Sequence, residues 1–401
     1  VAPPRIELSN EDLIRSHVHA IWLAEASLDL GTTLKDLLDL SGDSPSMNLL
    51  PGKKATIEDQ YAKSRAKLRA EKILKTIASE LSDAGWYGDN WLDDVMKQLG
   101  QNFEGACSRW KSLYKAAHQQ STLQSKIILD ASRSSKDKDT ARRLRAEAEA
   151  QLKLLTEYEH CLQSDFYSYR YFASEGFLPG YSFPRLPLSA YIPARRKGKY
   201  QDEYLSRPRF LAITEFGPRS IVYHEGSRYV IQKVIMPVQE DGILTRSAKQ
   251  CTVCGYLHPI SDPPGPDLCE RCKSKLDIPM TQLFRLENVS TRRRDKITSD
   301  EEERLQMGYE VRTGFRFAVR DGQVSCRKAS VLLGSSLLAT LTYGHATTLW
   351  RINLGWRRRE NKNQYGFVLD MERGYWARNE QIEDDDLEVS IGPRTSRVSL
   401  T

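Results

Sequence analysis

Two closely spaced pairs of cysteines constrain this chain more than any other feature. Cys251 and Cys254 form one Cys-x-x-Cys pair, and Cys269 and Cys272 form another beyond a loop that contains proline and glycine. Each pair can hold one side of a metal ion, and together they supply the four thiolates of a tetrahedral zinc site. Because the protein would provide all four ligands, no coordination position stays open for water or substrate. The pattern therefore predicts a structural Zn²⁺.

Other uses of these four cysteines remain open. An Fe–S cluster can also be held by four thiolates. Two disulfides would require an oxidising compartment, which is not expected: the remaining cysteines, Cys107, Cys161 and Cys326, are odd in number, and residues 1–5 contain no apolar signal segment. A redox dithiol is typical of a single pair beside a βαβ pattern. His258, just after the first pair, can also bind a metal, although four sulfurs already complete a site.

The composition is that of a globular protein with a mildly basic surface. The 401 residues are 40% hydrophobic and 28% charged, with a net charge of +6, which suits two or three domains. This charge permits a nucleic-acid partner without establishing one. The longest apolar run, residues 329–341, is interrupted by Gly334 and is too short to span a bilayer. We therefore expect a cytoplasmic protein without membrane contact, and its termini indicate a piece of a longer polypeptide.

The first part of the chain, residues 1–174, has the periodicity of a helical domain. Asn10 is a suitable N-cap for a first helix, and Gly31 follows the predicted end of that helix. Further apolar residues recur at helical spacing, and Ser134 to Asp139 is predicted to be a charged turn. The pattern predicts a helical bundle with long hairpins, with its other helices at residues 56–81, from 91 to beyond 129, and 140–161.

The second part, residues 175–401, is predicted to be rich in β-strands. Residues 176–187 contain repeated prolines and glycines and should form an ordered loop anchored by aromatic residues. A short helix is expected between the capping residue Thr298 and Gly308. The cysteine pairs fall between strands, so the fold class is α+β with a zinc-binding insertion at about residues 247–277. The expected strands are residues 220–224, 229–236, 282–289, 309–319, 324–332, 349–354 and 365–369.

Three clusters of basic residues lie beside aromatic residues or predicted strands. Arginine next to exposed aromatic rings suits backbone contact and base stacking on single-stranded nucleic acid. The alternative is that the clusters are solvated loops, as the small net charge favours. The candidate nucleic-acid-binding residues are Arg195, Arg196 and Lys197, then Arg292, Arg293 and Arg294, and finally Arg357, Arg358 and Arg359.

No motif that carries catalysis is found in the sequence. A phosphate-binding loop, a zinc-protease motif, a nucleophile elbow and a dinucleotide-binding fingerprint are all missing. The acidic run Glu383 to Asp386 is interpreted as a solvated turn, because adjacent carboxylates usually face water. We therefore assign no catalytic residue.

Several segments resemble the C-terminal halves of bacterial superfamily-two helicases that carry a four-cysteine zinc module. These are residues 10–20, 175–184, 206–218, 221–226, and 292–294 followed by 298–304, in addition to the cysteine pairs. In their order they are most similar to DrmA-like helicases of the DISARM antiphage system, and MrfA-type repair helicases are the nearest alternative. The resemblance covers about residues 5 to 370, and only the four cysteines correspond residue by residue.

The resemblance implies a C-terminal accessory region of an ATP-dependent DNA helicase. ATP would bind the two RecA-like motor domains, which this chain lacks, so the activity of the parent protein cannot be assigned to it. The implied role is DNA binding and docking of other subunits of the defence system. Two alternatives stay open: a protein-interaction scaffold without DNA contact, and a part of a DNA-repair helicase.

Overall fold

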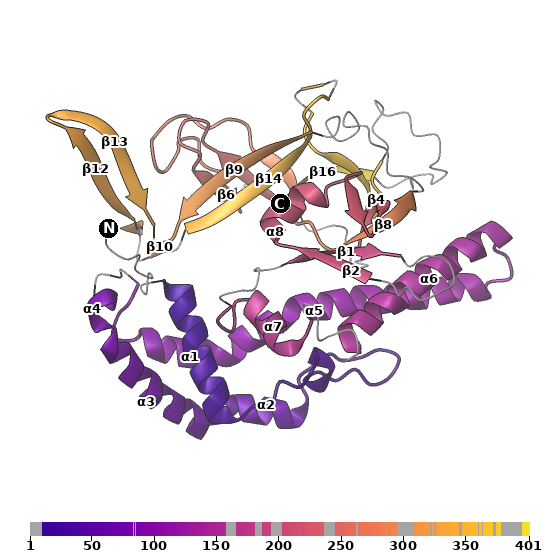
Figure 1. Cartoon of the computed structure of the whole chain (residues 1–401), viewed down its shortest axis with the longest axis horizontal. Helices are drawn as coiled ribbons and strands as arrows, with labels where there is room; N and C mark the ends of the chain where they lie inside the picture. Colours follow the sequence, from indigo (N-terminus) through magenta and orange to yellow (C-terminus); the bar gives the residue numbers. More distant parts are fainter. Residues whose placement is uncertain are drawn as a thin grey trace. The chain divides into compact units, whose positions relative to one another are not determined.

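The computed structural model divides into two compact units. The first comprises Val1–His118, Asp139–Arg185 and Phe317–Thr348, and the second comprises Gln119–Lys138, Leu186–Arg316 and Leu349–Thr401. Helices dominate the early part and strands the later part, which confirms the predicted α+β class (Figure 1). The structure describes residues 10–157 except 83 and 85, 166–180, 187–193, 203–235, 245–294 except 262–263, 308–320, 323–344 except 325, 347–359, 361–371 except 363, 374–377 and 395–401.

Helix α1, Glu11–Ala26, begins where the sequence predicts. The Asn10 side chain accepts a hydrogen bond from the backbone N–H of Leu13 at 3.1 Å, so Asn10 is the N-cap. The helix ends earlier than predicted, because Ser27 adopts a left-handed conformation with φ of 49° and stops the helix before Gly31.

Two other helix predictions are corrected by local capping. The segment 56–81 was expected to be one helix, but Asp59 interrupts it and accepts a hydrogen bond from the N–H of Tyr61. The last long helix begins at Ser135 rather than Thr140, because the Ser134 hydroxyl accepts from the N–H of Asp137 and caps it. The remaining helices are η1 Leu34–Asp36, α2 Pro51–Glu58, α3 Gln60–Thr76, α4 Ala78–Leu81, α5 Trp91–Leu129, α6 Ser135–Thr156, α7 Ser168–Ser174 and α8 Arg209–Glu215.

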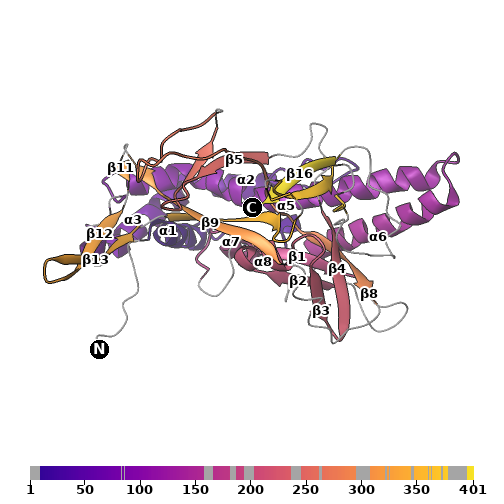
Figure 2. The same ribbon diagram turned by 90° about the horizontal axis from the view of Figure 1, so that it is seen from above.

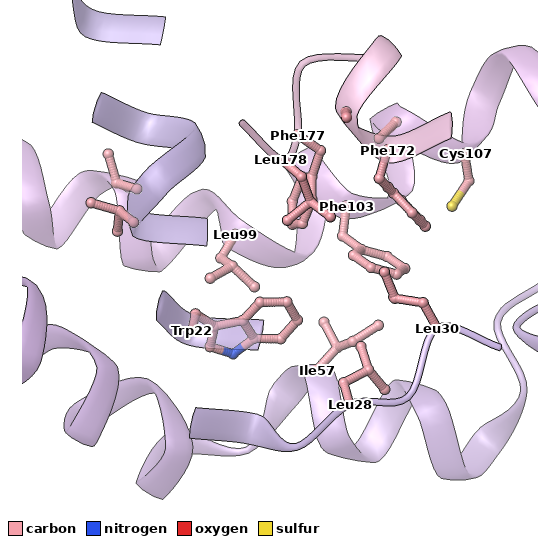
Figure 3. Close-up of a cluster of buried hydrophobic side chains, with 14 of the residues drawn as sticks. Trp22, Leu28, Leu30, Ile57, Leu99, Phe103, Cys107, Phe172, Phe177 and Leu178 are labelled. Atoms are coloured by element: carbon pink, nitrogen blue, oxygen red, sulfur yellow. The ribbon is translucent and has the colours of Figure 1, made fainter. Parts of the chain in front are cut away.

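The helices of the first unit share a core rich in aromatic residues (Figure 3). Phe103 from α5 contacts Trp22 and Phe172 with ring centroids 6.3 and 4.8 Å away. Phe177 and Leu178, which follow α7, are buried in the same cluster. For its described residues, 176–180, the Pro- and Gly-rich segment is therefore the predicted loop anchored by aromatic residues. None of the helices among the described residues is long and apolar enough to cross a membrane.

Two sheets build the second unit. Among the described residues, the order is β2-β1-β8-β4-β3 in a five-stranded sheet and β6-β5-β7-β16-β14-β9 in a seven-stranded sheet whose seventh strand, β15, pairs with β16. The bounds are β1 Leu188–Ile192, β2 Glu203–Arg207, β3 Ile221–His224, β4 Ser227–Val234, β5 Thr245–Gln250, β6 Leu257–Ile260, β7 Met280–Phe284, β8 Val289–Arg294, β9 Tyr309–Phe317, β14 Thr347–Trp356, β15 Phe367–Asp370 and β16 Thr395–Leu400.

Most predicted strands are present, with two corrections. The expected strand at 282–289 is two strands, β7 and β8, which belong to different sheets; between them the N–H of Leu286 bonds to the carbonyl of Thr401 at 3.1 Å. The expected strand at 324–332 is divided between β11 Gln323–Val324 and β12 Arg327–Leu333, which pair with β10 Val319–Arg320 and β13 Ser336–Tyr343. The helix expected after Thr298 lies outside the described residues.

Candidate metal centre

The four cysteines lie in two turns at the end of the seven-stranded sheet. Cys251 and Cys254 occupy the connection between β5 and β6, and Cys269 and Cys272 occupy the connection between β6 and β7. The antiparallel pairing of β5 with both β6 and β7 brings the two connections together. This agrees with the expected position of the cysteines between strands.

The two turns have the same backbone hydrogen bonds. In the first, the N–H of Gly255 donates to the carbonyl of Cys251 at 2.9 Å, and the N–H of Cys251 donates to the carbonyl of Tyr256 at 2.9 Å. In the second, Lys273 donates to Cys269 at 2.9 Å, and Cys269 donates to Ser274 at 2.8 Å.

The residue after the second cysteine of each turn is left-handed. Gly255 has a φ of 73° and Lys273 a φ of 62°. This conformation is natural for glycine and uncommon for lysine. The repeated backbone geometry lets each turn direct both of its sulfurs to one side.

The sulfur atoms are arranged to share one ion. All four lie within 4.8 Å of one another. The Sγ atoms of Cys251 and Cys272 are 3.5 Å apart, and those of Cys254 and Cys269 are 3.6 Å apart. Tetrahedral coordination with Zn–S bonds of about 2.3 Å requires separations of about 3.8 Å, whereas a disulfide requires about 2.05 Å. The described geometry therefore fits a four-thiolate metal site and not disulfides.

Burial and hydrogen bonding affect the four thiols differently. Cys251 and Cys269 are buried, whereas Cys272 lies at the surface. Burial raises the pKa of Cys254 to about 12, and it also raises the pKa of Cys269. Hydrogen bonds from Ser274 lower the pKa of Cys272 to about 6. Because a metal ion binds thiolates, it must displace the protons of Cys254 and Cys269, and metal affinity should rise with pH.

Residues of strand β9 contact both cysteine turns. The N–H of Phe315 donates to the carbonyl of Gly255 at 3.3 Å, and the guanidinium of Arg316 lies 2.9 Å from the carboxylate of Glu270. The neighbouring Arg271 places its guanidinium over the ring of Phe315 at 5.2 Å. These contacts were not predicted, because nothing in the spacing of the cysteines indicates which distant strand will pack against them.

His258 lies close to the turns but outside the sulfur cluster. Its side chain is 1% exposed, and its Nδ1 is 3.5 Å from a carboxylate oxygen of Glu270. Its ring packs edge-on against Tyr256 with centroids 5.2 Å apart. Desolvation lowers the pKa of His258, which favours the neutral ring. This placement agrees with the interpretation of four sulfur ligands, with His258 as a buried residue outside the cluster.

The structure describes two of the three basic clusters. Arg292, Arg293 and Arg294 form the end of β8, where Arg292 and Arg293 are exposed. Arg294 lies opposite Arg228 of β4, and Arg292 lies opposite Val230. Alternation along the strand places Arg292, Arg294 and Arg228 on one face of the sheet. The third predicted cluster, Arg195, Arg196 and Lys197, lies outside the described residues.

The other described cluster follows β14 in the seven-stranded sheet. Arg357 and Arg358 are exposed. Arg359 instead pairs with Glu310 at 2.8 Å and lies over the ring of Tyr365 at 4.6 Å. Arg359 thus has a structural role in joining the end of β14 to β9, and the binding of nucleic acid by this cluster stays a prediction.

Comparisons with protein-family models, with curated proteins and with solved structures find no match to this chain. The site is thus defined by its own geometry: two matched turns, four sulfurs within reach of one ion, and a strand that supports both turns.

Proposed function

We propose that this chain is a zinc-stabilised accessory region of a larger DNA-processing machine, contributing DNA contact and subunit docking. The observation that carries the proposal is the four-sulfur site, together with the arginines at the end of β8, the central strand of the five-stranded sheet. Four protein ligands leave no position for substrate, so the ion has a structural role. In this proposal the machine is a cytoplasmic ATP-dependent helicase of DISARM-type antiphage defence, whose motor domains lie elsewhere.

Zinc is the proposed ion because four thiolates in a tetrahedron are its usual structural set. The test is elemental analysis of reduced protein purified without added metal. We expect about one zinc per chain and no iron. A stoichiometric iron content with visible absorption would replace zinc by an Fe–S cluster.

The proposed DNA contact lies on the face of β8 that carries Arg292 and Arg294, since Arg228 beside them on β4 is buried. Guanidinium groups on one face of a sheet match the charge and the hydrogen-bonding geometry of phosphates. On this face Arg292 is exposed and Arg294 is half-buried, so a nucleic-acid backbone can reach this end of the strand. Phosphate contacts of this kind give affinity that falls steeply as salt rises.

The test is fluorescence anisotropy of a labelled single-stranded oligonucleotide at several salt concentrations. The double variant Arg292→Ala/Arg294→Ala should bind more weakly, and its salt dependence should fall by about 0.7 to 1 unit of slope for each lost contact. Arg142→Ala is the matched control, because Arg142 is an exposed arginine of α6 paired with Asp139 at 2.7 Å. Equal binding by both variants would reject this DNA-contact surface and leave the scaffold role.

A further inference from the structure

The hairpin β12–β13 exposes apolar side chains along its whole length. Its pairing runs from Arg327 opposite Tyr343 to Leu333 opposite Ser336. Every residue of β12 is exposed, and Leu333 and Leu341 are 70% and 63% exposed. A two-stranded hairpin of this kind is only marginally stable in water without a third strand or a covering element. The surface is therefore suited to pairing with another chain.

The two faces of the hairpin differ in chemistry. Alternation along β12, together with its pairing register with β13, places one set of residues on each face. The face that we call the apolar face carries Ala329, Val331, Leu333, Ala339, Leu341 and Tyr343, with Arg327 at one end and Ser336 beside the turn. The face that we call the polar face carries Lys328, Ser330, Thr340 and Thr342, with Leu332 and Leu337 near the turn.

The edge of β12 is open. Among the described residues, β12 pairs only with β13, and both views show a two-stranded ribbon (Figures 1 and 2). An open edge offers a row of backbone N–H and C=O groups that an added strand can pair with. Such an edge does not fit the hydrocarbon of a membrane, where its backbone groups would lack partners.

The charge of the hairpin defines the partner. The segment 323–348 contains no Asp or Glu, and its two formally charged residues, Arg327 and Lys328, both belong to β12 and are exposed. A strand paired with the edge of β12 would extend the apolar face and the polar face of the hairpin if apolar and acidic residues alternated along it. Its apolar side chains would extend the apolar face, and its carboxylates would lie beside Lys328 on the polar face.

We propose that the open edge of β12 is a docking site for a partner protein that adds a β-strand of alternating apolar and acidic residues. This surface specifies the docking part of the proposed function and rests on it. The DNA contact is assigned to Arg292 and Arg294, in another sheet. The oligonucleotide assay and the peptide assay therefore test separate surfaces. A negative result in one does not change the interpretation of the other.

The test uses two blocked, labelled peptides of about eight residues, the length of a typical strand. One alternates valine with glutamate and the other alternates valine with lysine. At low salt the wild-type chain should bind the Val–Glu peptide, and Lys328→Glu should weaken this binding about fivefold while strengthening binding of the Val–Lys peptide. The charge reversal is at an exposed position, so it should leave the fold and its melting temperature unchanged.

A third peptide shows whether binding is by strand addition. It has the Val–Glu sequence with methyl groups on alternate backbone nitrogens along one edge, so it cannot donate those hydrogen bonds. Loss of its binding supports pairing at the edge, and undiminished binding overturns the proposal. The proposal is also overturned if the wild-type chain and Lys328→Glu each bind the Val–Glu and Val–Lys peptides with equal affinity. Self-association that occupies this edge, or binding of anionic phosphatidylserine vesicles in place of the Val–Glu peptide, overturns it as well.

Discussion

The guanidinium of Arg316 lies 2.9 Å from the carboxylate of Glu270 and joins strand β9 to the turn that contains Cys269 and Cys272. The preceding residue, Phe315, bonds to Gly255 in the other turn. Two consecutive residues of β9 thus contact both halves of the sulfur cluster. This arrangement positions the turns through protein contacts as well as through a shared ion, and it leads to separate predictions for the ligands and for their support.

Replacing a buried ligand should release the metal and destabilise the second unit. Cys251→Ser leaves three thiolates and a weak hydroxyl ligand, and metal binding of this type contributes folding free energy of order 10 kcal/mol in small modules. We expect loss of bound metal by elemental analysis and a lower melting temperature. Cys326→Ser is the control, because Cys326 lies outside the cluster. Unchanged metal content and melting in Cys251→Ser would contradict a ligand role.

Removing the contact between Arg316 of β9 and Glu270 should weaken metal binding without abolishing it. Removing a residue that orients a ligand loop typically weakens metal affinity by about 10-fold to 100-fold. Arg316→Ala should therefore lose metal to a competing chelator at a lower chelator concentration than the wild type. Arg312→Ala is the matched control, because Arg312 pairs with Glu310 at 3.2 Å instead of with a cysteine turn. Identical chelator titrations of the two variants would show that β9 does not support the site.

The parts of the site that were predictable are those encoded by local spacing. Cysteines separated by two residues favour one tight turn, so the candidate ligand set follows from the sequence alone. The same is true of Asn10, whose short polar side chain precedes an amphipathic run and caps α1. Asp59 and Ser134 carry the same capping signal, and reading it there would have placed the boundaries of α3 and α6 correctly.

The parts that were not predictable depend on pairing between distant segments. Lys273 takes the left-handed position that Gly255 takes in the first turn, and a lysine gives no sequence signal for it. From the sequence alone, Glu270 would be interpreted as a solvated acid, because its pairing with Arg316 depends on where β9 packs. The break of the predicted strand 282–289 into β7 and β8 also depends on distant pairing. The chain leaves one sheet after β7 and enters the other at β8, and the periodicity of the sequence does not indicate this change of sheet.

Gly217 is predicted to be intolerant of any side chain. A Cβ at this position would lie 2.9 Å from the ring and hydroxyl of Tyr309, which is half-buried and donates a hydrogen bond to the carbonyl of Pro218 at 2.7 Å. Gly217→Ala must displace Tyr309 and should reduce the free energy of unfolding by about 1–3 kcal/mol. Denaturant unfolding measures this loss.

The matched control for that substitution is Gly308→Ala. A Cβ at Gly308 would be 3.9 Å from the Cβ of Arg357, which is an ordinary van der Waals contact. Gly308→Ala should therefore leave the unfolding midpoint nearly unchanged. If Gly217→Ala behaved in the same way, the close packing of Tyr309 on the 217–218 backbone would be wrong.

His19 should make the first unit sensitive to acid. It is buried in α1, where its Nδ1 lies 3.0 Å from the carbonyl oxygen of Phe177 and its ring stacks on the Phe177 ring. Desolvation lowers the pKa of His19 from 6.5 to about 4. The neutral ring donates its Nδ1 proton to the carbonyl, whereas its buried Nε2 has no hydrogen-bond partner among the described residues. Protonation would place a charge at this unpaired atom.

The direction of the pH effect follows from this lowered pKa. Between pH 6.5 and about 4 the unfolded chain binds a proton at His19 that the folded chain does not, so stability falls as the pH falls through this window. The loss should total about 3 kcal/mol. His19→Gln removes the titrating group, so its free energy of unfolding should fall less between pH 7 and pH 4.5 than that of the wild type. His118→Asn, a partly exposed site on α5, should retain the wild-type dependence. An equal loss in His19→Gln and the wild type would show that His19 is not the group responsible.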